Sequence, residues 1–451
     1  MPADRLFGPI STTPAMQEAV SDLAWVQAML DVEAALARAE ARCGLIPGEA
    51  AEAIAACCRA DRFDLAALGR EAVPSGTPVV PLVKALTAAV PREAAGYVHW
   101  GTTSQDVLDT AMMLVARRGL DLLLADLEAV AAAGAALAER HRATLMPART
   151  LLQQALPSTF GLKAAGWLTA TLEARDGLAE IRRRRLAVQL GGAAGTLAAL
   201  GGQGLEVSRE LAAELGLPEP VLPWHTARAR VAELGAALGV AAGTMAKVAR
   251  DVALMMQTEV GEAYEPAAPG RGGSSTLPHK RNPVAAVEVE ACFRGVQAQA
   301  GLLLAAMEQE HERAAGAWQA EWGAVSEAFR LTAGATSRVR EVLEGLEVDV
   351  HRMRSNLDLT RGLLLAEHVA MVLAPGVGRD RAQELVQAAS KRALADGRTL
   401  AEELEADPEV RSHLGPEEIR AALDPAAYLG SAGALVDRAL AEYRRGRSHR
   451  T

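Results

Sequence analysis

Proline is missing from four long stretches of this chain, and its absence constrains the fold more than any other sequence feature. The stretches cover residues 92–146, 158–217, 224–265 and 284–374. Proline breaks the interior of a helix because it removes a backbone donor and clashes with the preceding turn. Each stretch is therefore long enough for one or more uninterrupted helices.

The spacing of apolar residues has the period of a helix. From Ala24 it can be followed through Val26, Met29, Leu30, Val32, Ala35 and Leu36. We expect Asp31, Glu33, Arg38 and Glu40 to lie mostly on the opposite, polar side. Aromatic residues make up only 3% of the chain, whereas Ala, Leu and Glu are abundant, and this composition favours helix over sheet. The sequence predicts an all-α fold built around a bundle of long helices.

Breaks in the helical pattern suggest three helical domains. We expect an N-terminal domain over 1–110, a central long-helix bundle over 111–364 that carries a polar loop at 271–283, and a small C-terminal domain over 365–451. Several positions in the long helices are apolar on more than one face. Such faces need partners from other chains, so a homo-oligomer is expected.

Charge and cysteine content exclude several classes of protein. The net charge is -9, and no basic patch with interleaved aromatic residues occurs, so we expect no nucleic-acid partner. The N-terminus lacks the pattern of a signal peptide, and no uncharged run of membrane-spanning length is evident. The four cysteines, Cys43, Cys57, Cys58 and Cys292, contain no C-x-x-C spacing, which favours buried, reduced thiols. A cytoplasmic protein that does not bind membranes is predicted.

The segment 272–283 is the most informative part of the sequence for function. It reads GGSSTLPHKRNP and carries hydroxyls, a lysine and an asparagine just before the expected start of a helix. Small residues let a loop bring its backbone close to a ligand, and a helix N-terminus favours anions. The segment therefore predicts a site that binds and stabilises an anion.

A second polar cluster, HWGTTSQD at 99–106, precedes another apolar helical run. Thr103 or Ser104 could cap that helix, with Asp106 in its first turn, so a purely structural role is possible. The three consecutive hydroxyls could instead bind a carboxylate.

Three further segments have less specific patterns. The order QEHER at 309–313 is expected in mid-helix as an exposed, ion-paired face, because it lacks the second histidine of a metal-binding H-E-x-x-H motif. The glycines between 191 and 204 lack the preceding strand and the acidic residue of a dinucleotide loop, so they predict a turn where two helices approach closely. Residues 148–157 predict a helix start or a loop.

These motifs resemble those of the fumarase/aspartase superfamily of lyases. Residues 273–283 are similar to its signature loop, G-S-S-x-M-P-x-K-x-N-P, with Leu277 at the methionine position. The pattern H-x-G-x-T-S-x-D at 99–106 resembles a second family region, and 148–150 a third. The resemblance covers nearly the whole chain and implies a fumarase/aspartase-like fold whose central bundle assembles into a tetrameric helical core.

Within the superfamily, the segments 7–10, 98–106 and 310–322 are most similar to the muconate cycloisomerase branch. That likeness implies a cycloisomerase of aromatic-compound breakdown, in which one carboxylate of a tricarboxylate adds to the substrate's own double bond. The implied enzyme uses no metal or nucleotide cofactor. Its partners would be a small di- or tricarboxylate and three further copies of the chain, with each site shared by three chains.

The resemblance also assigns roles to individual residues. Ser274, Lys280 and His99 are implied to be catalytic, with Ser274 exchanging a proton with carbon and Lys280 stabilising the developing charge. The implied substrate-binding residues are Thr103, Ser104, Ser275, Asn282, Thr150, Gln153 and Arg313.

One departure from the superfamily pattern has a chemical consequence. Lyases that release a nitrogen group usually carry histidine after the Arg-Thr pair, where this chain has Leu151. An amine leaves badly without a proton, so it needs a general acid. A carboxylate, with a pKa of about 4, leaves without one. The leucine therefore favours a carbon–carboxylate bond over the reaction of adenylosuccinate lyase, the alternative enzyme. A catalytically silent helical scaffold is the non-enzyme alternative.

Overall fold

The computed structural model describes residues 6–267, 272–273, 277 and 279–448. It confirms the all-α prediction, because helices make up most of the described residues and the sheets found there have two strands each. Ser274 and Ser275 of the predicted site lie outside the described residues.

The chain divides into two compact units, each built from three segments. Unit 1 comprises Met1–Glu128, Glu173–Lys247 and Glu288–Val339, and unit 2 comprises Ala129–Leu172, Val248–Val287 and Arg340–Thr451. The predicted division into three domains at 110 and 364 stays a prediction.

Long helices occupy the proline-free stretches, as predicted. They are α8 (Ser104–Arg140), α9 (Phe160–Arg184), α11 (Ala229–Met255), α12 (Val284–Ala305) and α13 (Ala317–Glu344), and each contributes residues to both units. Close packing between them uses small residues. A side chain at Gly235 of α11 would come within 2.7 Å of Leu303 on α12, so glycine permits that contact. The apolar window of α11 is long enough to span a membrane, but more than half of it is buried, as in the core helix of a bundle.

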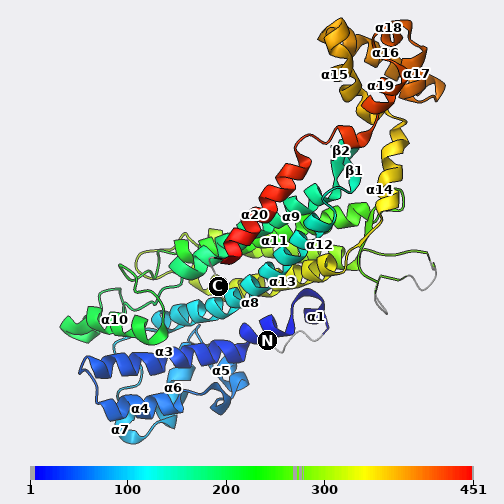
Figure 1. Cartoon of the computed structure of the whole chain (residues 1–451). Helices are drawn as coiled ribbons and strands as arrows, with labels where there is room; N and C mark the ends of the chain where they lie inside the picture. The colour runs from blue at the N-terminus through cyan, green and yellow to red at the C-terminus, as the bar shows by residue number, and fades with distance from the viewer. Residues whose placement is uncertain (1–5, 268–271, 274–276, 278, 449–451) are drawn as a thin grey trace. The chain divides into compact units, whose positions relative to one another are not determined.

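The remaining helices of unit 1 come mostly from its N-terminal segment, where α3 and α4 lie side by side (Figure 1). They are α1 (Gly8–Ser11), α2 (Pro14–Ala19), α3 (Asp22–Arg42), α4 (Gly48–Cys57), η1 (Ala60–Arg62), α5 (Leu65–Ala72), α6 (Val79–Ala89), α7 (Arg92–Ala95), η2 (Ala198–Gln203) and α10 (Gly204–Leu215). Ser21 caps α3 by accepting a hydrogen bond from the backbone N–H of Ala24 at 3.1 Å.

Helix α3 shows both the success and the failure of the periodicity argument. Its predicted apolar stripe from Val26 to Leu36 is buried. Glu33 and Glu40, however, are 1% and 0% exposed, so the prediction that they lie on a polar face is wrong. Glu33 is buried because it binds a histidine, as described below.

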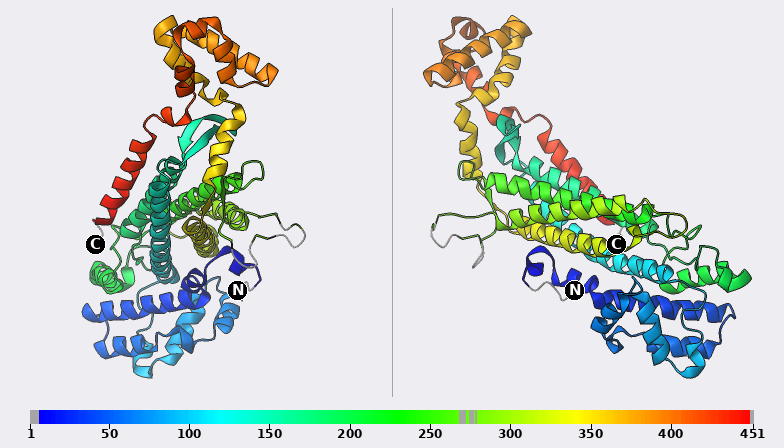
Figure 2. Two further views of the ribbon diagram at one scale, coloured as in Figure 1. Left: turned by 45° about the vertical axis from the view of Figure 1, so that its right-hand side comes forward. Right: turned by 180° about the vertical axis from the view of Figure 1, so that it is seen from behind.

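Unit 2 holds the two small sheets and the C-terminal helices, of which α15 to α19 form a compact cluster in every view (Figure 2). Its elements are β1 (Leu145–Thr150), β2 (Gln153–Thr159), β3 (Ala263–Tyr264), β4 (Glu347–Val348), α14 (Val350–Leu357), η3 (Asp358–Thr360), η4 (Leu363–Leu365), α15 (Ala366–Val377), α16 (Arg379–Asp396), α17 (Leu400–Ala406), α18 (Pro408–His413), α19 (Pro416–Ala422), η5 (Pro425–Ala427) and α20 (Ala432–Ser448). Buried aliphatic residues, including Val369, Leu385 and Leu404, form the core of the α15–α19 cluster.

Candidate active site

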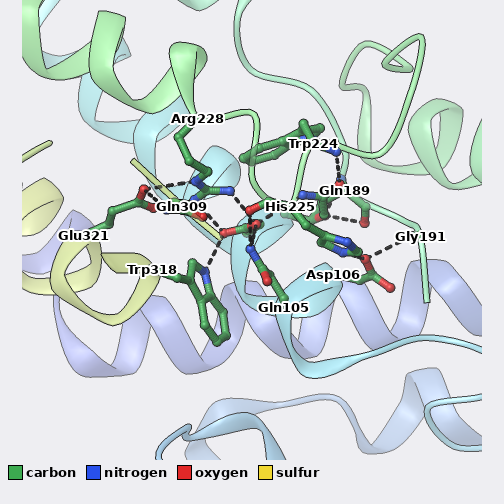
Figure 3. Close-up of polar contacts among 12 residues, drawn as sticks. Gln105, Asp106, Gln189, Gly191, Trp224, His225, Arg228, Gln309, Trp318 and Glu321 are labelled. Atoms are coloured by element: carbon green, nitrogen blue, oxygen red, sulfur yellow. Dashed lines mark hydrogen bonds and ion pairs between the residues drawn. The ribbon is translucent and has the colours of Figure 1, made fainter. Parts of the chain in front are cut away.

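Asp106, in the first turn of α8, joins three segments of unit 1 (Figure 3). Its carboxylate accepts a hydrogen bond from the backbone N–H of Thr103 at 3.1 Å. It also accepts from the N–H groups of Gly191 at 3.0 Å and Gly192 at 2.9 Å, and Nε2 of His225 lies 2.6 Å away. Asp106 therefore fixes the start of α8, where the predicted carboxylate-binding hydroxyls lie.

The glycines at 191 and 192 are required by these contacts. A Cβ at Gly191 would lie 2.8 Å from the ring of His225, and Gly192 has a φ of 67° and approaches the carbonyl oxygen of Gly101. The segment is thus a backbone cradle for the Asp106 carboxylate. For Gly191 and Gly192, the prediction of a turn where two helices approach closely is wrong, because they pack against the loop that precedes α8 and against the loop that contains His225.

One turn further along α8, Asp109 forms a buried ion pair with Arg228. Two N–H groups of Arg228 donate to Asp109 at 2.7 and 3.0 Å, and its Nε donates to Glu321 of α13 at 3.0 Å. Trp318 Nε1 donates to Asp109 at 2.9 Å. Burial lowers the pKa of Arg228, but the two carboxylates outweigh it and raise that pKa above its usual value. The charged guanidinium thereby connects α8 to α13 within unit 1 (Figure 3).

The hydroxyl of Thr103 accepts a hydrogen bond from Arg313 Nη1 at 3.0 Å, so the structure brings together two of the predicted substrate-binding residues. Arg313 does not lie in mid-helix as predicted. The segment from 306 to 316 is a loop between α12 and α13, and His311 has a φ of 48° that a helix cannot contain. The loop lets Arg313 reach the start of α8.

His99 lies in the loop that contains Thr103 and ends at Ser104, the first residue of α8, and its backbone has a φ of 60°. Its Nδ1 is 2.6 Å from Oε1 of the buried Glu33. Burial lowers the pKa of His99, but the charge and hydrogen bond of Glu33, with a contribution from Asp106, raise it above its usual value overall. A protonated imidazole at this position can attract a carboxylate.

The predicted residues Thr150 and Gln153 face each other at the end of a β-hairpin in unit 2. Their segment was expected to be a helix start or a loop. It forms β1 and β2 instead, joined by Leu151 and Leu152, which have φ values of 49° and 67°. Arg149 anchors the hairpin by donating to the buried Glu262 at 2.6 and 2.8 Å.

The signature loop also belongs to unit 2, where its described residues form a short stem. The N–H of Asn282 donates to the carbonyl oxygen of Gly272 at 2.8 Å, and Gly273 forms a β-bridge with Arg281. Lys280 is exposed.

A cavity of about 920 Å³ in unit 1 is lined by residues including Trp25, Met29 and Trp322. Of the predicted site residues that the structure describes, none lines it. We therefore assign no catalytic role to this cavity.

Comparisons with known proteins identify the family. The profile described as "Lyase" matches residues 3–300, and "Adenylosuccinate lyase C-terminus" matches residues 362–439. The chain belongs to the lyase family.

Similar lyases cover almost the full length of the chain. A 3-carboxy-cis,cis-muconate cycloisomerase from Bradyrhizobium diazoefficiens is 52% identical over 96% of this chain and 97% of its own. A nitrosuccinate lyase from Streptomyces davaonensis is 48% identical over 99% of this chain and 96% of its own. The crystal structure of the 3-carboxy-cis,cis-muconate lactonizing enzyme from Pseudomonas putida has a TM-score of 0.94 at 46% identity, covering 98% of this chain and 99% of that one.

The predicted site residues of this lyase are divided between the two units. His99, Thr103, Ser104 and Arg313 gather in unit 1. The other described residues of the predicted site, Lys280, Asn282, Thr150 and Gln153, belong to unit 2.

The sequence patterns did not identify several residues that shape the site. Asp106 and His225 are separated by 119 positions and carry no motif that links them. No motif links Arg228 to its partner Glu321 on α13 either. An i, i+3 pair of aspartates at 106 and 109 just before an apolar helix is the only local signal that could have indicated a buried polar cluster.

Proposed function

We propose that this chain is a cycloisomerase that interconverts 3-carboxy-cis,cis-muconate and 4-carboxymuconolactone. The observation that carries the proposal is its similarity, over nearly its full length, to relatives named for that activity in several bacteria. The reaction belongs to the breakdown of aromatic compounds through protocatechuate and β-ketoadipate.

The reaction begins inside one molecule. One substrate carboxylate attacks the substrate's own double bond, so the enzyme must fold the substrate into a reactive geometry. Negative charge then develops on the carboxylate next to the other alkene carbon. Lys280 and Asn282 stabilise that charge, together with N–H groups of the signature loop. Loss of one such donor typically slows an enzyme by ~10²–10³-fold.

Ser274 then delivers a proton to carbon, and in the reverse direction it removes one. A serine alkoxide needs stabilisation by nearby cations and N–H groups in a site that excludes water. Lys280 supplies such a cation six residues further along the loop.

The remaining candidate residues bind the substrate carboxylates. His99, held by Glu33, attracts one of them, and its raised pKa favours the charged form of its ring. Thr103, Ser104 and Arg313 bind a second carboxylate, which the contact between Thr103 and Arg313 supports. Ser275, Thr150 and Gln153 make further contacts.

The hairpin turn supports a leaving group that needs no acid. At Leu151 the chain carries an aliphatic side chain that cannot donate a proton, in a turn with 97% of that residue exposed. The lactone oxygen leaves as a carboxylate, so its departure requires no proton from the enzyme. The proposed reaction also balances without a metal or a nucleotide.

We further propose a cytoplasmic homotetramer in which three chains contribute to each site. Exposed apolar side chains on the long helices support assembly, among them Val240 of α11 and Val287 and Leu304 of α12. The exposed Leu151 and Leu152 would likewise be covered by another copy of the chain.

A second candidate is a lyase that acts on nitrosuccinate. The nitrosuccinate lyase relative is about as similar to this chain as several of the cycloisomerases are. Nitrite, like a carboxylate, leaves as the anion of an acid, so Leu151 fits both reactions. The adenylosuccinate lyase alternative is not favoured, because its nitrogen leaving group needs an acid.

A substrate panel tests the proposal. Purified protein given 3-carboxy-cis,cis-muconate should deplete the ultraviolet absorption of its conjugated double bonds without added metal or nucleotide. Parallel assays use nitrosuccinate with nitrite detection, and adenylosuccinate. Faster turnover of either of these, or no turnover of the muconate, overturns the proposed substrate. Ser274→Ala should abolish turnover while leaving the thermal midpoint nearly unchanged, and full activity in that variant would refute its acid–base role.

A further inference from the structure

Arg281 of the signature loop is exposed, yet its side chain contacts three residues of unit 2. Its two terminal nitrogens donate to the Glu347 carboxylate at 2.8 and 3.0 Å, and one of them also donates to the carbonyl oxygen of Glu265 at 2.7 Å. Its guanidinium lies 4.8 Å from the centre of the Tyr264 ring. All four residues belong to unit 2. One side chain thus connects the end of the loop to both strands of the β3–β4 sheet.

Glu347 also holds the segment that precedes the signature loop. Its carboxylate also accepts a hydrogen bond from the backbone N–H of Ala267 at 3.0 Å. Ala267 and Arg281 therefore share one carboxylate, although 14 positions separate them in the sequence. Arg281 lowers the pKa of Glu347 through its hydrogen bonds, although partial burial opposes this, so the acceptor is ionised at neutral pH.

Two backbone contacts lie immediately beside this pair. Asn282 N–H donates to the Gly272 carbonyl oxygen at 2.8 Å, and Gly273 bridges to Arg281. Gly272 has a φ of 65°, and a Cβ there would lie 2.8 Å from the Asn282 carbonyl oxygen, so only glycine fits this approach without strain.

The following helix is fixed by the same group of residues. The buried carboxylate of Glu265 accepts hydrogen bonds from the N–H groups of Ala285 at 3.1 Å and Ala286 at 2.8 Å, in the first turn of α12. Lys280 and Asn282 flank Arg281. Asn282 therefore lies between a pinned side chain and a capped helix start, and Lys280 directly precedes the pinned residue.

We propose that Arg281 is a positioning residue that sets where Lys280 and Asn282 lie, and that Glu347 is its counterpart. We call the set Tyr264, Glu265, Ala267, Arg281 and Glu347 the loop clamp. The inference rests on the proposed function, because that function gives Lys280 and Asn282 their role in stabilising charge. The clamp acts through these two residues and does not touch the substrate.

Because Arg281 and Glu347 are partly exposed, their effect on loop position can be distinguished from an effect on folding stability. The side chains of Arg281 and Glu347 are 39% and 45% exposed. Exposed ion pairs contribute little to folding stability. Loosening the clamp should therefore change the geometry of the loop far more than the stability of the fold. A misplacement of about 1 Å near reacting groups can reduce a rate by ~10²-fold.

The test uses Arg281→Lys, Glu347→Gln and the double variant in the full-length protein. Arg281→Lys keeps the charge and loses the forked geometry. Arg142→Lys is a matched control, because Arg142 also makes a bidentate pair, with Asp437 of unit 2, and both partners are about half exposed. We expect either clamp variant to lower kcat by ~10–100-fold with a smaller change in KM. The double variant should be little worse than the single ones. The thermal midpoint should match that of Arg142→Lys.

Hydrogen exchange gives a readout that does not depend on turnover. The amide protons of Lys280 and Asn282 are bonded to the carbonyl oxygens of Leu277 and Gly272, and they should exchange faster in the clamp variants. Unchanged exchange and kcat in both clamp variants would overturn the inference, as would an equal loss in Arg142→Lys. If the wild type does not act on the muconate, the proposed function fails, and the exchange comparison still decides whether the clamp exists.

Discussion

The Glu33 carboxylate lies 2.6 Å from Nδ1 of His99 and is 1% exposed. Asp106 of α8 also contributes to the raised pKa of His99. The buried anion raises the pKa of the partly exposed imidazole, so the pair favours a positively charged ring at this position.

The first prediction concerns Glu33→Gln. Burial alone would lower the pKa of His99, and Glu33 is what raises it, so the variant should move that pKa downward. In the variant, less of His99 carries a positive charge at about neutral pH. We therefore expect KM for the muconate to rise ~10-fold, because the hydrogen bond between a charged His99 and a substrate carboxylate is weakened or lost. The pH at which KM begins to rise should also shift to lower values. NMR titration of histidine ring carbons measures the pKa directly, and an unshifted His99 signal would contradict the assignment.

The sign of the stability effect follows from the same pair. The pKa of His99 is higher in the folded state than in the unfolded state. The His99–Glu33 pair therefore stabilises the fold fully below the unfolded pKa of the histidine, and this stabilisation is lost as pH rises through the folded pKa. Wild type and Glu33→Gln should therefore differ most in thermal midpoint on the acid side of neutrality and converge as pH rises. A difference that grows with pH would have the wrong sign.

The second prediction concerns Glu40, which is fully buried and whose carboxylate oxygens have no hydrogen-bond partner among the described residues. Burial, aided by the charge of Glu33, raises its pKa to about 9. Between its unfolded and folded pKa values, the folded state holds a proton that the unfolded state releases. Stability should therefore fall as pH rises, by up to ~1.4 kcal/mol per pH unit.

Glu40→Gln should remove this slope. At about pH 5 the variant and wild type should have similar thermal midpoints, and at about pH 8 the variant should be more stable by up to roughly 4 kcal/mol. Glu71→Gln, at an exposed position of α5, is the control for loss of a carboxylate. Parallel pH profiles for wild type and Glu40→Gln would show that Glu40 ionises normally.

The third prediction concerns the buried arginine. Arg228→Met leaves the carboxylates of Asp109 and Glu321 buried without their cation, which should cost about 3–5 kcal/mol and lower the thermal midpoint by roughly 5–10 °C. Arg230→Met is the matched control, since Arg230 also stacks on Trp224, at 4.7 Å compared with 4.8 Å for Arg228. Similar midpoints for the two variants would mean that the buried cluster contributes little to stability.

The long helices and the two main motifs could be predicted because their signals are local. Proline-free stretches correspond to α8, α9, α11, α12 and α13, and the apolar spacing from Val26 to Leu36 identified the buried stripe of α3. Periodicity, however, assigns every charge to the surface. It could not detect that Glu33 and Glu40 are buried, because their environment comes from distant segments of the chain.

Contacts between distant residues and backbone conformations account for the other differences. Asp106 meets His225 and the glycine cradle only through the fold, so no local spacing reveals the cluster. The loop around His311 lacks the proline that would have marked the end of α12. The turn at 151 and 152 lacks the usual Asn-Gly signal, so the hairpin was missed.

That turn supplies the last prediction. Leu151 and Leu152 both have positive φ values in a two-residue hairpin turn, where Asn-Gly is favoured and leucine is strained. They are also 97% and 76% exposed. Such strain persists where a ligand or partner makes use of it. The double variant Leu151→Asn, Leu152→Gly should therefore raise stability by about 1–2 kcal/mol, and lower kcat/KM for the muconate by ~10-fold if another copy of the chain uses the leucines at its site.

Thermal unfolding and steady-state kinetics separate the two effects. Leu222→Asn controls for the loss of an exposed leucine, because Leu222 is 73% exposed in a loop and has no positive φ. A higher midpoint with unchanged kinetics would place the leucines away from the chemistry, and an unchanged midpoint would show that the turn stores no strain. Loss of activity together with higher stability would mean that the chain keeps an unfavourable turn because the aliphatic side chains are needed at the site.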